Sequence, residues 1–237
     1  MEEIRSPLFA SAVLVVTLLL TGCAGARNPG DPLEPLNRGI YRFNDSIDKA
    51  VLKPVAQGYN AVMPLPGKIM ASNFISNLDD VLVTVNDLLQ LKFTQAASDS
   101  ARVLFNSTFG MFGLFNVADR LEKHNEDFGQ TLGYWGIGSG PYLMLPILGS
   151  SSVRDGTGLY VDGFASVPYN IGHVPTRNKY YAASGIHRRS ALLDQEKVLD
   201  EAVIDRYEFI RDTYLLHRKS LVYDGNPPRA RYDEGEE

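Results

Sequence analysis

An apolar run near the start of the chain ends close to the only cysteine of the sequence. Residues 7 to 20 are apolar apart from Ser11 and Thr17, and Cys23 follows shortly after them. A run of this length is too short to cross a bilayer, but it is typical of the core of a signal peptide. Because there is one cysteine, an internal disulfide and a cysteine-based zinc site are excluded, and non-covalent packing must hold the folded part together.

The residues just before Cys23 suit cleavage by a peptidase. The sequence "LTGC" (20 to 23) has small residues at 21 and 22 and resembles the lipobox of bacterial lipoproteins, in which the thiol receives a diacylglycerol and the new amine an acyl chain. We therefore interpret residues 1 to 22 as a lipoprotein signal peptide, Cys23 as the lipid attachment residue, and 23 to 30 as a lipidated tether. The alternative is a buried cysteine in a retained signal anchor. Ala24 stands where inner-membrane lipoproteins commonly have aspartate, which favours the outer membrane.

The overall composition indicates a folded domain. Hydrophobic residues make up 44% and charged residues 22% of the chain, which fits neither a disordered protein nor an ordinary polytopic membrane protein. The net charge is −5, and no basic block stands out. We therefore expect no nucleic-acid partner.

Apolar residues recur at steps of three or four in several segments, which predicts helices. Asp31 is the expected N-cap of the first helix, with Pro32 at its first position, and Thr94 is expected to cap another. The best strand candidate, "VLVTV" (81 to 85), is outweighed by the helical period around it. The predicted fold class is all-α, with helices at 31–54, 78–89, 94–105, 178–193 and 197–221, and a disordered tail at 224–237.

The segment "FGMFGLF" (109 to 115) carries no polar side chain. It is far too short to cross a bilayer. One interpretation is a buried turn between core helices, and the other is a turn embedded in a membrane leaflet, with Phe109, Phe112 and Phe115 in lipid.

A second unusual segment, "FGQTLGYWGIGSGPYLMLPILGS" (128 to 150), is rich in glycine and contains Tyr134, Trp135 and Tyr142. Aromatic side chains with a polar tip are common at membrane–water boundaries. This composition is unfavourable in water unless it folds inward or meets lipid. Together the two segments favour a helical body that lies in one leaflet without crossing the membrane.

No catalytic constellation is apparent. The glycines at 136 to 140 lack the spacing of a nucleotide-binding loop, and "GSSSV" (149 to 153) lacks the second glycine of a nucleophile elbow. Ser150 to Ser152 fit a helix N-cap cluster better. Asp79 and Asp80 are expected to be solvated, and His124 is expected in a surface loop. We therefore predict that the protein is not an enzyme and binds no metal or cofactor apart from its lipid chains.

Four motifs together resemble the VacJ/MlaA family of outer-membrane phospholipid-transport lipoproteins. They are "DPLEPLNRGIYRFNDSID" (31 to 48), "SNFISNLDDVLVTVNDLLQ" (72 to 90), "ARVLFNSTFGMFGLFNVA" (101 to 118) and "DFGQTLGYWGIGSGPYLMLPILGSSSVRDGTG" (127 to 158). The resemblance covers residues 31 to 223. It implies a ring-like bundle of amphipathic helices in the inner leaflet of the outer membrane, facing the periplasm.

The resemblance also implies a function. Members remove mislocalised phospholipids from the outer leaflet through an amphipathic channel, associate with a trimeric porin, and pass the lipid to the periplasmic carrier of an ABC transport system. The channel or gate residues that it implies are Phe43, Asn44, Tyr134, Gly136, Gly138, Gly140 and Tyr142. Two alternatives remain open: a structural lipoprotein that only scaffolds a porin, and a lipid hydrolase, for which no nucleophile motif is present.

Overall fold

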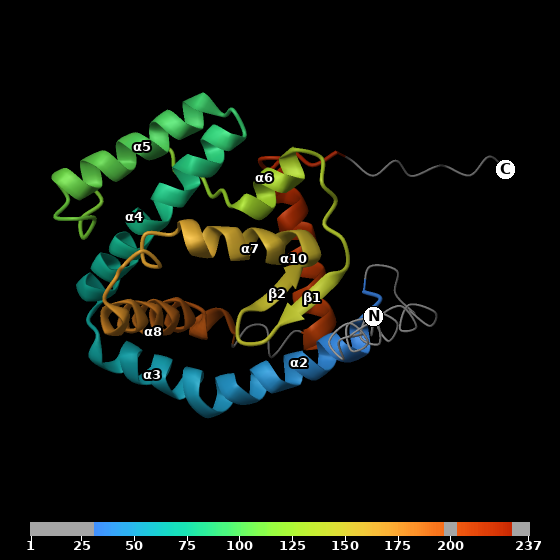
Figure 1. Ribbon diagram of the computed structural model, residues 1–237. Coiled ribbons are helices and arrows are strands. Elements are labelled where there is room, and N and C mark those ends of the chain that lie inside the picture. Colours follow the sequence, from blue (N-terminus) through green and yellow to red (C-terminus); the bar gives the residue numbers. More distant parts are fainter. Residues whose placement is uncertain (1–30, 197–202, 229–237) are drawn as a thin grey trace, which may run out of the picture.

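The computed structural model describes residues 31–196 and 203–228, and most of this part is helical (Figure 1). Cys23, the signal-peptide segment and residues 229–237 lie outside the described residues. No helix within the described ranges combines the length and the apolar character needed to cross a membrane. The elements in chain order are α2 (Glu34–Ile47), the π-helical turn η2 (Asp48–Leu52), α3 (Lys53–Val62), α4 (Leu65–Leu89), α5 (Phe93–Thr108), α6 (Phe128–Tyr134), β1 (Tyr142–Leu145), β2 (Gly149–Ser152), α7 (Val153–Ala165), α8 (Val174–Ala191) and α10 (Arg206–Val222).

The helix periods predicted most of these elements, but some ends were wrong. Residues 81–85 lie inside α4, so the helical period there is confirmed. Asp31 does not cap α2, because the helix begins at Glu34 and the Asp31 side chain is buried against Asn37 and Tyr207. Thr94 lies inside the first turn of α5, whose cap position is Lys92. The last long helix begins at Arg206, after an Asp205 side chain that accepts from the N–H groups of the first turn.

One antiparallel hairpin corrects the all-α prediction. β1 and β2 pair from Tyr142 opposite Ser152 to Leu145 opposite Gly149. The turn between them places Ile147 at φ 66° and Gly149 at φ 88°, which is the left-handed region that closes short hairpins. The hairpin was not predicted because "YLML" and "GSSS" show no alternation of apolar and polar residues. Ser152 does cap α7, as the serine cluster predicted.

The buried positions of this protein are mainly polar. Among the described residues, the buried polar and charged side chains outnumber the buried hydrophobic ones, while many large hydrophobic side chains are exposed. The main apolar cluster joins Tyr142 and Met144 of β1 to Tyr207 of α10, with Ile40, Tyr41, Tyr214 and Leu215 packed around it. This distribution is the reverse of an ordinary water-soluble domain, in which buried positions are chiefly apolar.

Hydrogen bonds from α2 fix the position of the hairpin. The buried Asn37 side chain donates to the Tyr142 carbonyl at 3.0 Å and accepts from the Met144 N–H at 2.9 Å. Two helical turns further along α2, the Asn44 side chain bonds to the hairpin turn in the same way. The seven-residue spacing places both amides on the same face of the helix.

α8 lies beside α3 (Figure 1), and charged contacts join the end of α8 and the following Glu196 to η2 and to the start of α3. Arg189 binds the Asp48 carboxylate through two nitrogens at 2.7 and 2.8 Å, and Glu196 accepts from Lys53, Arg189 and Arg206. These charged contacts connect the first helices of the domain to its C-terminal part.

Candidate functional site

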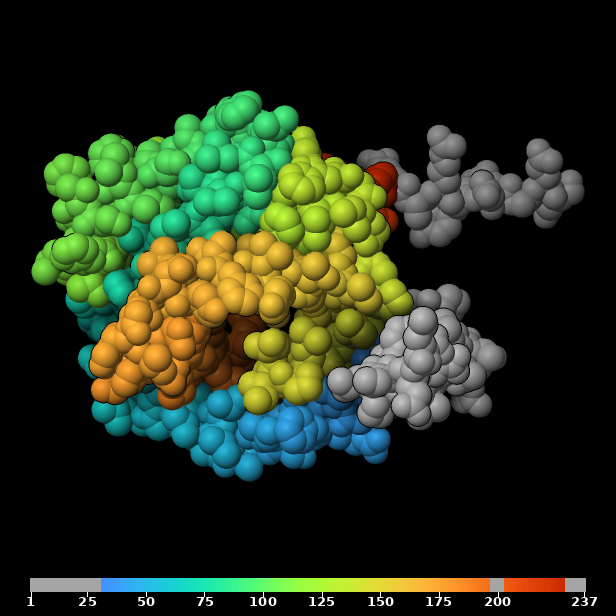
Figure 2. Space-filling view, viewed as in Figure 1, coloured from blue at the N-terminus to red at the C-terminus, as the bar shows by residue number. Residues whose placement is uncertain are grey.

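A hollow of about 380 Å³ opens between α7, α8 and the hairpin. Figure 2 shows it as a depression between the hairpin and the segment that runs from α7 towards α8. Its lining is aliphatic, aromatic or glycine throughout: Leu145, Leu148, Gly156, Leu159, Tyr160, Gly163, Phe164, Tyr169 and Tyr181. No charged residue belongs to this lining, so the hollow suits the apolar part of a ligand and disfavours a charged one.

Three aromatic side chains form a continuous wall of the hollow. The rings of Tyr160 and Phe164 lie 4.7 Å apart, and those of Phe164 and Tyr169 lie 4.9 Å apart, both edge to face. This geometry is favourable for aromatic pairs and restricts their rotamers. The wall is therefore built before any ligand arrives.

The hairpin forms the opposite side of the hollow, and Asn44 holds its turn. The Asn44 side chain donates to the Leu145 carbonyl at 2.9 Å and accepts from the Ile147 N–H at 2.8 Å. Leu145 and Leu148, on either side of Ile147, both line the hollow. Asn44 therefore acts on the hollow through the hairpin, and it is itself outside the lining.

The other predicted channel residues lie elsewhere. Phe43, on α2, is 52% exposed and is absent from the lining of the hollow. Tyr134, Gly136, Gly138 and Gly140 are absent from the lining of the hollow.

Tyr142 is fully buried, where its ring packs against Tyr207 and Tyr214 and its hydroxyl bonds to Ser150 at 2.9 Å. Tyr142, which the resemblance implies shapes or gates a channel, therefore lies in the core beside the hairpin and outside the lining of the hollow, and its role in a channel stays a prediction.

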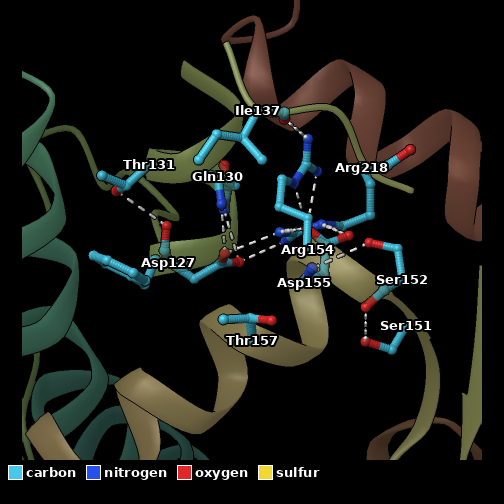
Figure 3. Close-up of polar contacts among 12 residues, drawn as sticks. Asp127, Gln130, Thr131, Ile137, Ser151, Ser152, Arg154, Asp155, Thr157 and Arg218 are labelled. Carbon is cyan, nitrogen blue, oxygen red and sulfur yellow. Dashed lines mark hydrogen bonds and ion pairs between the residues drawn. The ribbon is translucent and has the colours of Figure 1, made fainter. Parts of the chain in front are cut away.

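A cluster of charged side chains joins α6, α7 and α10 (Figure 3). Arg218 donates to Asp127 at 2.9 Å and to Asp155 at 2.9 and 3.1 Å, and Arg154 donates to Asp155 at 2.8 and 2.9 Å. Burial by itself would raise the pKa of Asp155, but the hydrogen bonds and charge of Arg218 outweigh it and lower that pKa to about 2. Asp155 is therefore ionised at every physiological pH.

Two glycines let α6 and α7 approach within this cluster. A Cβ atom on Gly158 would lie 2.3 Å from the Gly129 nitrogen, closer than packed atoms come. Gly158 therefore requires glycine for the helices to cross where they do, whereas a Cβ atom on Gly129 would press on the Asp155 and Arg218 side chains at 2.8 and 2.9 Å.

The turn after α5 projects apolar side chains into the surroundings. Phe109, Phe112 and Phe115 are 69%, 78% and 47% exposed, so the alternative of a buried turn between core helices is wrong. Met111 and Phe112 have φ values of 52° and 59°, which non-glycine residues rarely adopt. The left-handed backbone at two successive non-glycine residues is therefore found at the tip of the exposed apolar turn.

A second cavity, of about 590 Å³, is polar and lies between α5, the segment before α6 and the end of α10. His124 lines it and is bonded through Nδ1 to the buried Asp99 at 2.7 Å, so His124 is not a simple surface-loop residue as the sequence suggested. Asp80 is also buried and bonded to Lys123 at 2.5 Å, whereas it was expected to be solvated. No group of histidine, cysteine and acidic residues within the described ranges could hold a metal ion.

Sequence reasoning missed the residues that line the hollow. Five of them lie on α7 at positions 156, 159, 160, 163 and 164. This spacing of zero, three, four, seven and eight marks one helix face, on which glycines alternate with bulky apolar residues. The sequence "GTGLYVDGF" (156 to 164) carries this helical spacing, which is the signal that could have identified this face.

Comparison with known proteins decides the family. The family model described as MlaA lipoprotein matches residues 29–221. This chain belongs to the MlaA lipoprotein family. The resemblance carried by the four sequence motifs is thereby confirmed.

Related proteins are similar along most of their length. The chain is 35% identical over 233 residues to the intermembrane phospholipid transport system lipoprotein MlaA of Escherichia coli (strain K12), covering 91% of this chain and 88% of that one. The protein of the same name from Haemophilus influenzae is 30% identical over 225 residues, covering 90% and 89%. A chain solved in work on the structural basis for maintenance of bacterial outer membrane lipid asymmetry superposes with a TM-score of 0.71 at 31% identity, covering 83% of this chain and 99% of that one.

Proposed function

We propose that this protein is an outer-membrane lipoprotein that removes mislocalised phospholipids from the outer leaflet through an amphipathic channel, of which the apolar hollow is a part. The observation that carries this proposal is the uncharged, aromatic-walled hollow in a protein whose relatives are named as phospholipid transport lipoproteins. A phospholipid that changes leaflets exposes either its head group or its tails to the wrong medium. An apolar wall beside a polar surface lowers that free-energy cost without covalent chemistry.

Exposed apolar side chains support placement of the body in one leaflet. Apolar side chains are exposed along α2, η2 and α3, with exposed fractions between 45% and 85% at Leu36, Phe43, Val51, Val55 and Val62. Such exposure is unfavourable in water and fits contact with lipid or another protein. The helices around the hollow would then form the ring that the family resemblance implies.

Several backbone groups of the apolar turn after α5 bond within the protein, which lowers the cost of placing the turn in lipid. The N–H groups of Phe112, Gly113 and Phe115 donate to carbonyls at 3.1, 2.9 and 2.9 Å. The Leu114 carbonyl accepts from Asn73 at 3.2 Å. These bonds support the proposal that Phe109, Phe112 and Phe115 enter the acyl region of the leaflet.

The proposed anchor is Cys23, which would carry a diacylglycerol and an N-acyl chain after removal of residues 1 to 22. Several acyl chains hold a protein at a membrane far more firmly than one chain does. The tether from 23 to 30 would let the helical body reach the inner leaflet of the outer membrane and face the periplasm. A trimeric porin beside the body and the periplasmic carrier of an ABC transport system are the proposed partners.

A bulky side chain placed in the hollow tests the proposal. Gly163 lies in the lining, and a Cβ atom there would meet nothing within 4 Å, so Gly163→Trp fills the hollow without a backbone clash. The matched control is Gly39→Trp, at an exposed helical glycine of α2 that also has open space. Each variant replaces the wild type in a strain that lacks it, and phospholipid in the outer leaflet is measured with a surface acylation reporter.

We expect Gly163→Trp to raise surface phospholipid to the level of the strain without the protein, while Gly39→Trp restores the wild-type level. Porin association, measured by co-purification, should be equal for the two variants. If Gly163→Trp restores lipid asymmetry fully, the hollow is not the path. If porin association alone tracks asymmetry across the variants, the protein is a scaffold and does not conduct lipid.

A further inference from the structure

The aromatic wall of the hollow ends at an arginine. Tyr160, Phe164 and Tyr169 follow one another along the wall, and the Arg177 guanidinium carbon lies 5.6 Å from the centroid of the Tyr169 ring. Arg177 is half-buried in the first turn of α8 and is not part of the lining. The guanidinium therefore sits beside the last ring of the apolar surface, at the rim of the hollow.

No carboxylate of the described residues neutralises the charge of Arg177. In residues 31–196 and 203–228, most arginines have a carboxylate within ion-pair distance, but Arg42, Arg120 and Arg177 have none. Of these three, Arg177 alone contacts a ring that lines the hollow. Stacking on Tyr169 restricts the guanidinium while leaving its N–H groups free to bind an anion.

We infer that Arg177 binds the phosphate of a phospholipid whose acyl chain occupies the hollow. The inference rests on the proposed function and adds the residue that orients the lipid. The lining carries no charge, so the phosphate of such a lipid must remain outside the hollow while its chain enters. Arginine suits this position, because its planar N–H groups bind two phosphate oxygens together.

The surroundings of Arg177 strengthen this assignment. The first turn of α8 carries the positive end of the helix dipole, which favours an anion beside it. The volume of about 380 Å³ lies near the lower end of the range for ligand pockets, which suits an acyl chain without its head group. A lipid bound in this way has its head group at α8 and its chain along Tyr169, Phe164 and Tyr160.

The test compares two lipids that differ only in the phosphate. The full-length lipoprotein is purified in detergent, and its affinity is measured for a fluorescent phosphatidylglycerol and for a fluorescent diacylglycerol with the same chains. The variants are Arg177→Ala, Arg177→Lys and the matched control Arg120→Ala, an exposed arginine that also lacks a carboxylate partner. Inorganic phosphate is added as a competitor in a separate series.

We expect Arg177→Ala to weaken phosphatidylglycerol binding about tenfold or more and to leave diacylglycerol binding unchanged. Arg177→Lys should be intermediate, because lysine keeps the charge but not the bidentate geometry. Arg120→Ala should match the wild type for both lipids, and millimolar inorganic phosphate should not displace the lipid.

Other results would overturn the inference in distinguishable ways. Unchanged phosphatidylglycerol binding in Arg177→Ala removes the role of Arg177 and leaves the proposed function intact. Equal loss of both lipids shows that Arg177 only supports the fold of the wall. Displacement by micromolar inorganic phosphate makes free phosphate the ligand. If the wild type binds neither lipid, the proposed function itself fails.

Discussion

Asn44 accepts a hydrogen bond at 2.8 Å from the backbone N–H of Ile147, which lies 103 residues further along the chain. The same side chain donates to the carbonyl of Leu145 at 2.9 Å, so one amide holds both sides of the hairpin turn. The turn carries Leu148 and Leu145 into the lining of the hollow. The shape of the hollow therefore depends on a residue of the first helix that does not line it.

Asn44→Ala should release the turn of the hairpin. Loss of both bonds should lower the free energy of unfolding by about 1–3 kcal/mol. Hydrogen exchange should speed up at the Ile147 amide, while the Met144 amide, which Asn37 binds, keeps its protection. Equal acceleration at both amides would mean that the two asparagines act as one clamp, contrary to this expectation. Asn60→Ala, which removes one bond between α3 and α8, is the control for stability alone.

Arg218→Gln should destabilise the cluster that joins α6, α7 and α10. The buried Asp155 would lose its main cationic partner, and we expect a loss of about 3 kcal/mol or more in denaturant unfolding at neutral pH. Arg188→Gln is the control, because its ion pair with Asp79 is exposed and should contribute less than about 1 kcal/mol. Similar losses for the two variants would show that the cluster adds no more than a surface ion pair.

The same cluster sets the stability of the protein in acid. Arg218 lowers the pKa of Asp155 to about 2 against the opposing effect of burial, and it also lowers the pKa of Asp127. An unfolded aspartate has a pKa of about 3.9. As the pH falls, the unfolded chain therefore binds protons before the folded protein does. The contribution of these aspartates to the free energy of unfolding is complete above about pH 4 and is lost as the pH falls towards 2. The unfolding temperature of the wild type should therefore fall as the pH is lowered from 6 to 2, and that of Arg218→Gln should depend less on pH.

Asp87→Asn should stabilise the protein above pH 5. Both carboxyl oxygens of Asp87 are buried without a hydrogen-bond donor. Burial first, and then the charges of Asp99 and Glu126, raise its pKa to about 7. The folded protein keeps a proton that the unfolded chain releases near pH 4, so stability falls as the pH rises from about 4 to 7.

The neutral asparagine removes this dependence of stability on pH. We expect the free energy of unfolding to rise by about 2 kcal/mol at pH 7.5 and to change little at pH 4. Urea unfolding at a series of pH values measures the free energy at each pH. Asp119→Asn, at an exposed position, should be neutral throughout. A loss of stability in Asp87→Asn at pH 7.5 would contradict the raised pKa of Asp87 in the folded protein.

Phe112→Asp should weaken membrane binding without unfolding the body. Phe112 is 78% exposed at the tip of the apolar turn, so little packing is lost. Removing one phenylalanine from lipid should reduce partitioning by about tenfold or more, since burial of such a side chain is worth about 1.5–3 kcal/mol. Flotation of protein that lacks residues 1 to 23 with phospholipid vesicles measures this directly, without the apolar run or the proposed lipid anchor.

Leu216→Asp is the control for that experiment, because Leu216 is 71% exposed but lies on α10 next to His217. We expect vesicle binding of Leu216→Asp to match that of the parent. If both substitutions reduce flotation equally, the turn has no special part in membrane contact.

The sequence by itself determined the helical class, the family and the unusual character of the 109–115 turn. The helix periods and the four motifs are local, so they can be read along the chain, and the exposed phenylalanines agree with one of the two interpretations left open. The apolar stripe of α2 was also visible, because a helix repeats every 3.6 residues. The sequence could not say that Leu36 and Phe43 of this stripe are exposed and that Asn37 is buried instead.

Only the tertiary structure decided which residues surround the hollow and what supports them. Asn37 and Asn44 bind β1 and its turn across more than 100 residues, and Tyr142 meets Tyr207 in the core. A short hairpin has no stable structure in isolation, so its strands form only where α2 supplies partners for their backbone. The pairing of distant segments placed Tyr142 inside the core and the aromatic face of α7 at the hollow. The physical reason is that buried backbone N–H and C=O groups need hydrogen-bond partners, and for the hairpin these partners come from a distant helix.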